Sequence, residues 1–69
     1  MKHGDVVRAL RQAATRQGLR FEVVELTRHS AVTVGGTTRT LGRHSEIDEV
    51  TAKKSWSQFS DELGRGWWR

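Results

Sequence analysis

A pair of adjacent glycines places the strongest constraint on how this 69-residue chain can fold. Gly35-Gly36 stands between AVTV and TTRTL, two stretches rich in the β-branched residues valine and threonine. Glycine adopts the positive φ angles of a two-residue hairpin turn without steric cost, and β-branched residues favour strands. The sequence therefore predicts a β-hairpin over residues 29–41, with a positive φ angle at both glycines.

The predicted turn also fixes the register of the hairpin. Counting outward from the glycines gives four cross-strand pairs: Val34 with Thr37, Val32 with Arg39, Ser30 with Leu41, and His29 with Gly42. Side chains alternate between the two faces of a strand, and cross-strand partners point to the same face. We therefore expect one face, toward the core, to hold Val32, Val34 and Leu41, and the other to hold His29, Ala31, Thr33, Thr38 and Thr40.

Three further segments have recognisable patterns. Residues 4–18 show apolar residues at helical spacing, with Asp5 as the expected N-cap and Gly18 as the C-terminal stop. Residues 20–26, RFEVVEL, fit a strand with Phe21 and Val23 on one face. Residues 50–64 predict one second helix that ends at Gly64, preceded by the capping acids Asp48 and Glu49. Its expected apolar stripe consists of Ala52, Trp56, Phe59 and Leu63.

The order helix, three strands, helix predicts an α+β fold, in which a three-stranded antiparallel sheet carries both helices on one face. A chain of 69 residues supports a single domain, here residues 1–69, with 66–69 as a flexible or packed tail. We expect Trp67 and Trp68 to pack on the core or to contact a partner protein, and base stacking is the alternative. The absence of cysteine and of an apolar run of about 20 residues favours a soluble cytoplasmic protein.

The composition points to a polyanionic partner. Twelve Lys and Arg residues against eight Asp and Glu give a net charge of +4, and nine of the twelve are arginine. Arginine forms paired hydrogen bonds with phosphate, so the excess of arginine is typical of nucleic-acid binding. The alternative is that these side chains only solvate a small surface.

The triplet Arg-His-Ser occurs twice, at residues 28–30 and 43–45. The hairpin would bring both copies to its open end, with His44 diagonal to His29 at about 7–8 Å. Arg28 and Arg43 would repel each other there unless an anion lay between them, which favours a phosphate site. Imidazole titrates near neutral pH, so a histidine at this site can exchange a proton with a ribose 2′-hydroxyl. Two alternatives remain for His29 and His44. Either they are exposed polar residues without a further role, or they bind zinc, although His3, a third ligand for such a site, is distant in sequence.

These features together resemble the HicA-type toxins of bacterial toxin-antitoxin systems. The resemblance lies in the order of elements, the histidine at the start of the second strand, and the passage TLGRHSEIDEVTAKK into the last helix. It implies a fold like that of a double-stranded RNA-binding domain, an endoribonuclease activity on mRNA that needs no metal or other cofactor, and a HicB-like antitoxin as partner. By position, His29 matches the catalytic histidine of the family, and residues 41–44 match its proline-and-histidine passage.

The chain departs from the family pattern at three places. Thr27-Arg28 stands where the family has glycine or a small residue, no proline precedes His44, and Val50-Thr51 replaces Gly-Thr. The bulky Arg28 bears most on catalytic competence, because it directly precedes the candidate catalytic residue.

The sequence thus predicts an mRNA-cleaving toxin in which His29 is the general acid or base. Arg28, Arg43 and His44 are expected to hold the scissile phosphate. Arg39, Lys53 and Lys54 are expected to contact the RNA backbone. The rival hypotheses are a non-catalytic RNA-binding module on the same fold and a protein-binding adaptor without salt-dependent RNA affinity.

Overall fold

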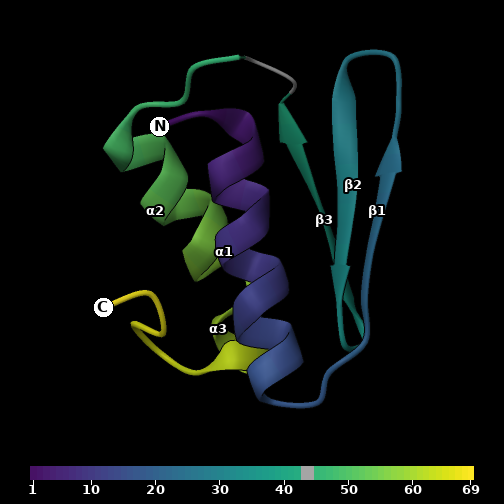
Figure 1. The fold of residues 1–69 in the computed structure, drawn as a ribbon, viewed down its shortest axis with the longest axis vertical. Coiled ribbons are helices and arrows are strands. Elements are labelled where there is room, and N and C mark those ends of the chain that lie inside the picture. Colours follow the sequence, from purple (N-terminus) through teal and green to yellow (C-terminus); the bar gives the residue numbers. More distant parts are fainter. Residues whose placement is uncertain (43–44) are drawn as a thin grey trace.

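A computed structural model describes residues 1–42 and 45–69 and has the predicted order of elements (Figure 1). The helix α1 (His3–Arg16) is followed by three strands, β1 (Phe21–Glu25), β2 (His29–Val34) and β3 (Thr37–Gly42). The chain continues through α2 (Glu49–Ser57) and the short α3 (Ser60–Leu63). The strands form an antiparallel sheet in the order β1-β2-β3, with the helices on one face. The α+β fold expected from the sequence is confirmed.

The hairpin formed by β2 and β3 has the predicted register. Its four expected pairs, from Val34 with Thr37 to His29 with Gly42, are all present. On the face away from the helices, the hydroxyls of Thr33 and Thr38 lie 2.8 Å apart. Of the two glycines in the turn, only Gly35 takes a positive φ angle, of 60°, so the prediction for Gly36 was wrong. A type II′ turn explains this difference, because it requires left-handed backbone at its first central residue alone.

The first helix begins earlier than predicted. Asp5 is not the N-cap, because α1 starts at His3 and the Asp5 amide already donates to the Lys2 carbonyl at 3.0 Å. The carboxylate of Asp5 instead lies 3.5 Å from Arg8, one turn further along. Gly18 does follow the helix with a φ angle of 68°, as predicted. None of the helices in the described part of the chain is long and apolar enough to cross a membrane.

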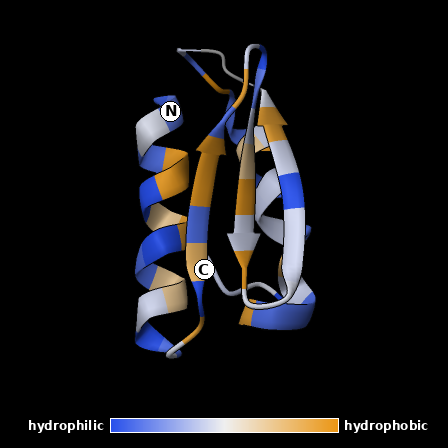
Figure 2. Cartoon of the chain, turned by 90° about the vertical axis from the view of Figure 1, so that its right-hand side faces the viewer, coloured by the Kyte–Doolittle hydropathy of each residue, from blue (hydrophilic) through white to orange (hydrophobic). Residues whose placement is uncertain are grey.

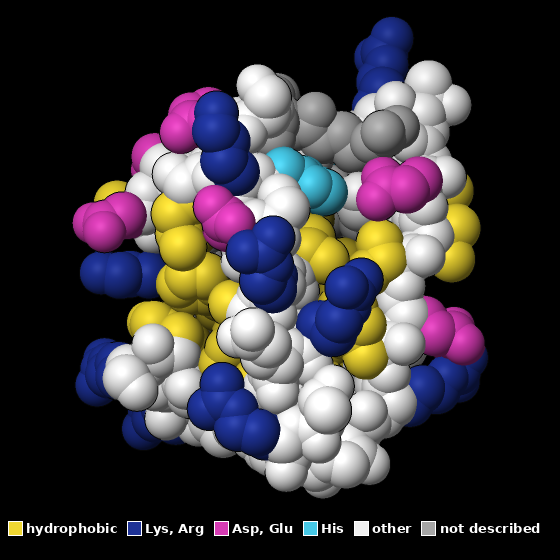
Figure 3. Space-filling model, in the orientation of Figure 1, with side chains coloured by type: hydrophobic (Ala, Val, Ile, Leu, Met, Phe, Trp, Pro, Cys, Tyr) yellow, Lys and Arg dark blue, Asp and Glu magenta, His cyan; other side chains and the backbone are white. Residues whose placement is uncertain are grey.

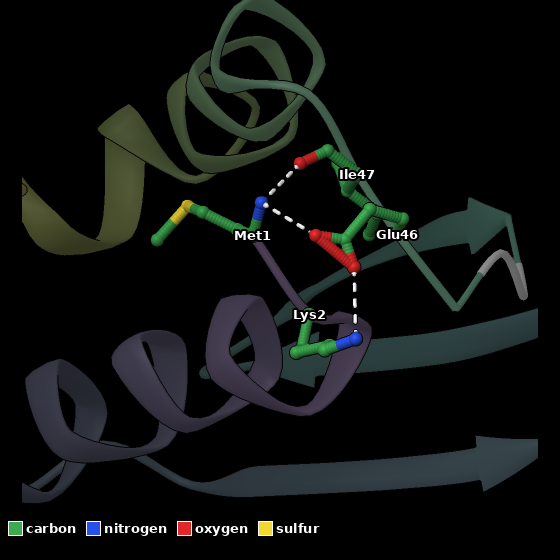
Figure 4. Close-up of polar contacts among 4 residues, drawn as sticks. All are labelled: Met1, Lys2, Glu46 and Ile47. Carbon is green, nitrogen blue, oxygen red and sulfur yellow. Dashed lines mark hydrogen bonds and ion pairs between the residues drawn. The ribbon is translucent and has the colours of Figure 1, made fainter.

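The early start of α1 is explained by contacts with the segment that follows β3 (Figure 4). The amide of Ile47 donates to the Met1 carbonyl at 2.6 Å, and the His3 amide donates to the Ser45 carbonyl at 3.3 Å. The ammonium group of Lys2 lies 3.1 Å from the Glu46 carboxylate. These contacts join the first turn of α1 to residues 45–47, so the backbone before α1 is already held in place where the helix begins.

The C-terminal part of the chain forms two helices instead of the single one predicted. After Ser57 the amides of Gln58 and Phe59 bond to carbonyls three residues back, and Phe59 leaves the helical region with φ −105° and ψ 19°. The hydroxyls of Ser57 and Ser60 bond to backbone carbonyls in this stretch, as serine side chains do where they compete with a helix. The predicted apolar stripe is nevertheless buried at each of its positions, Ala52, Trp56, Phe59 and Leu63.

One core lies between the sheet and the helices. Val32, Val34 and Leu41 of the hairpin are buried in it, as the alternation of faces predicted. They pack with the apolar residues of α1 and α2 in one cluster. Trp67 and Trp68 are half-buried and pack against this cluster, which confirms packing as their structural role. The indole of Trp67 donates to the Trp56 carbonyl at 2.9 Å, so the tail is folded back onto α2.

Two exposed carboxylates link the stability of this fold to pH. Hydrogen bonding and charge from Lys2 lower the pKa of Glu46 below its ordinary value of 4.5. Hydrogen bonds from the Thr51 hydroxyl and amide lower the pKa of the α2 cap Asp48 below 3.8. A carboxyl group with a lowered pKa contributes stability that is fully present above its unfolded pKa and is lost as the pH falls through its folded pKa.

We therefore expect the thermal unfolding midpoint to fall as the pH decreases from about 5 to 3. In the Lys2→Met variant, part of this decrease should be absent, because Glu46 then loses the partner that lowers its pKa most and keeps only the N-terminal ammonium group. Lys53→Met removes the same charge from α2 and is the matched control. Identical midpoint profiles for wild type and Lys2→Met would contradict the proposed role of the Lys2 ion pair.

Candidate functional site

His29 lies at the first position of β2 and is exposed. Its neighbour Ser30 is fully buried on the core side, so alternation places His29 on the opposite, open face of the sheet. In Figure 2 the strands lie toward the viewer, and the helices lie beside and behind them. The carbonyl of His29 accepts a hydrogen bond of 2.8 Å from the Leu26 amide, which closes the turn between β1 and β2. A large substrate can therefore reach this imidazole from the open face.

The other members of the predicted phosphate site are described only in part. Arg28 is exposed in the connection that leads into β2. Arg43 and His44 lie outside the described residues, so the clustering of the two Arg-His-Ser copies stays a prediction. The described pairing of His29 with Gly42 is the register on which that prediction depends.

The three predicted backbone contacts lie on the helix side of the molecule. Arg39 pairs with the buried Val32 and shares its face of the sheet, although its own side chain is exposed at the edge strand. Its guanidinium donates to the Thr38 carbonyl at 3.3 Å. Lys53 and Lys54 are exposed on α2, in the layer that covers the same face. Arg39 is therefore separated by the thickness of the sheet from the face that carries His29.

A polar network that the sequence did not predict lies next to His29 on the inner face. The hydroxyl of Ser30 donates to Glu25 Oε2 at 2.8 Å and lies 3.3 Å from His3 Nε2. Because the Ser30 proton is committed to Glu25, the serine oxygen accepts from Nε2–H of His3. The network thus joins α1 and β1 to the second residue of β2. One signal was present in the sequence, since the predicted alternation places polar Ser30 on the core-facing side.

This arrangement differs from that of a nucleophilic serine. A nucleophilic hydroxyl passes its proton to a histidine and faces the substrate. Ser30 instead has 0% exposed surface and gives its proton to a carboxylate. The network therefore holds the start of β2 in place, directly beside the candidate catalytic histidine.

Removal of the Ser30 hydroxyl is expected to weaken the fold. Ser30→Ala removes the buried oxygen that bonds to half-buried His3 and exposed Glu25, and the lost hydrogen bonding costs about 1 kcal/mol because both partners can bond to water instead. Urea unfolding of wild type and variant measures this difference. Thr40→Ala, an exposed hydroxyl on the open face, is the matched control and is expected to change little. A free energy of unfolding unchanged by Ser30→Ala would contradict the network.

Comparison of the chain with models of known protein families, with curated proteins and with solved structures finds no match. Within residues 1–42 and 45–69, no group of three or more His, Cys, Asp and Glu side chains is placed to hold a metal ion. His29 and its exposed neighbour Arg28 are the described members of the candidate catalytic site.

Proposed function

We propose that this chain is an mRNA-cleaving endoribonuclease of the HicA toxin type, with His29 as its general acid or base. The observation that supports the proposal most is the exposed position of His29 at the first residue of β2, on the open face of the sheet. The α-β-β-β-α order and the excess of arginine agree with it. A HicB-like antitoxin is the protein partner that belongs to this proposal.

The proposed reaction uses the RNA itself as the nucleophile. Neutral His29 removes the proton of a ribose 2′-hydroxyl, and the 2′-oxygen attacks the adjacent phosphorus. The bond between phosphorus and the 5′-oxygen of the next nucleotide breaks, and this oxygen receives a proton from a general acid or from water. The products are a 2′,3′-cyclic phosphate and a free 5′-hydroxyl. Arg28 next to His29 supplies positive charge for the phosphate oxygens as negative charge develops on them.

The test is incubation of the purified chain with a defined mRNA in the presence and absence of EDTA. We expect cleavage in both conditions, with cyclic phosphate and 5′-hydroxyl ends on the fragments. Intact RNA, or fragments with 5′-phosphate ends, would contradict the proposed chemistry.

The second candidate is an RNA-binding module without catalysis. It is favoured by the position of Arg39, which pairs with the buried Val32 and so lies on the face of the sheet opposite that of His29. Under this hypothesis the chain retards RNA in a gel with strong salt dependence but leaves it intact. The incubation above separates the two candidates, because only the endoribonuclease generates new RNA ends.

A further inference from the structure

A cavity of about 340 Å³ opens between the first turns of α1 and strand β1, on the side of the sheet opposite His29. Figure 3 shows this face of the molecule, where basic side chains, acidic side chains and a histidine lie around apolar patches. The volume lies within the range of pockets that hold small organic ligands. The residues that line the cavity are His3, Gly4, Val7, Arg8, Arg11, Val23 and Glu25.

The lining combines three kinds of group. Arg8 and Arg11 are exposed and offer guanidinium groups on one rim, one turn apart on α1, and the Arg8 guanidinium also lies 3.5 Å from the Asp5 carboxylate. Val7 and Val23 supply apolar wall surface from α1 and β1. The carboxylate of Glu25, which accepts a hydrogen bond of 2.8 Å from the Ser30 hydroxyl, forms another side of the cavity.

The guanidinium of Arg11 lies over an aromatic ring. Its central carbon lies 5.5 Å from the centroid of the Phe21 ring, which is a cation–π contact. This attraction favours a position of the guanidinium close to the start of β1. A guanidinium plane is also a surface on which unpaired RNA bases stack.

We propose that this cavity binds one unpaired nucleotide of an RNA strand, an inference that rests on the proposed function. The phosphate contacts Arg8 and Arg11, because these groups carry the positive charge of the rim. The base lies against the apolar wall formed by Val7 and Val23. A free inorganic anion would use the two arginines alone and leave the apolar wall exposed to water, so the lining favours a whole nucleotide.

The position of the cavity relates it to the candidate catalytic residue. His3 of the cavity bonds to Ser30, which directly follows His29 in β2. The cavity and His29 thus both lie near the start of β2, the cavity on the helix side of the sheet and His29 on the open face. An RNA strand that passes around this end places one nucleotide in the cavity and a neighbouring phosphate at the open face.

Binding is tested with three probes: 5′-AMP, adenosine and inorganic phosphate, each titrated into ¹⁵N-labelled protein. We expect 5′-AMP to bind more tightly than either of the others and to shift the amide signals of Gly4 and Val23. Arg8→Ala and Arg11→Ala should each weaken 5′-AMP binding about tenfold, as expected for the loss of a charged hydrogen bond. Arg65→Ala, which removes the same charge from an exposed position outside the cavity, should have no effect.

A second kind of variant tests the site by filling the cavity instead of removing a positive charge from its rim. Gly4 lies in α1, and a β-carbon added there meets no atom within 4 Å. Gly4→Leu should therefore fold, and its side chain should fill the cavity and abolish the shifts caused by 5′-AMP. Equal affinity for phosphate and 5′-AMP would overturn the proposal, and so would unchanged 5′-AMP binding in Gly4→Leu.

The cleavage assay separates this inference from the proposed function. We expect Gly4→Leu to raise KM for RNA about tenfold with kcat little changed, since it removes binding and leaves His29 in place. Cleavage of RNA with the same KM in wild type and Gly4→Leu would overturn the nucleotide site and leave the endoribonuclease. Binding of 5′-AMP by a wild type that leaves RNA intact would support the nucleotide site and overturn the endoribonuclease.

Discussion

Replacement of His29 by alanine is expected to lower the rate of RNA cleavage by about 100- to 10 000-fold, the range that a general acid or base contributes. The side chain is exposed at the first residue of β2, so its removal leaves the core and the strand register unchanged. The proposed mechanism also predicts which kinetic parameter changes. Because His29 acts on the 2′-hydroxyl during the reaction, kcat should fall while KM stays near the wild-type value.

The measurement is single-turnover cleavage of a labelled RNA, with circular dichroism to verify the fold. Thr40→Ala is the matched control, because Thr40 is also exposed on the open face of the sheet. RNA retardation in a gel should be similar for wild type, His29→Ala and the control. Cleavage by His29→Ala at the wild-type rate would show that His29 is not the general acid or base of the reaction.

The fold could be predicted from the sequence because its signals are local. Gly35 and the flanking β-branched residues define the hairpin within a few positions, and the alternation of side chains then fixes each cross-strand pair. The apolar stripe from Ala52 to Leu63 identified the buried positions of the C-terminal part even though the helix is broken. A stripe of apolar residues stays on one side of the chain as long as the number of residues per turn remains close to that of a helix. The tighter turn at Phe59 meets this condition.

The polar network could not be predicted, because it depends on tertiary packing. His3 and Ser30 are separated by 27 positions, and no local rule joins them. Their contact follows from the early start of α1, which itself depends on bonds between residues 1–3 and 45–47. Asp5 was a reasonable N-cap by residue type, yet contacts from a distant segment decided where the helix begins. The cavity beside His3 was missed for the same reason.

Replacement of Trp56 by alanine is expected to unfold the chain at ambient temperature. Trp56 is 7% exposed, and its ring centroid lies 5.8 Å from that of Trp67 and 6.3 Å from that of Trp68. Its indole donates to the Val6 carbonyl at 3.2 Å, which ties α2 to α1. Truncation of a buried tryptophan costs about 3–5 kcal/mol. A single core in a chain of this length supplies about the same amount of net stability, so little or none remains.

Near-ultraviolet circular dichroism and thermal unfolding test this expectation, and a graded variant shows which contact matters. Trp56→Phe keeps an aromatic ring in the core but lacks the indole donor, so we expect it to fold with a lower unfolding midpoint. Val50→Ala is the control on the same helix, because Val50 is exposed and should tolerate the change. A cooperative transition near the wild-type midpoint in Trp56→Ala would mean that α2 docks on α1 without this side chain. The attachment of α2 would then depend on Ala52, Phe59 and the cap at Asp48, and the tail with Trp67 would contribute little to the core.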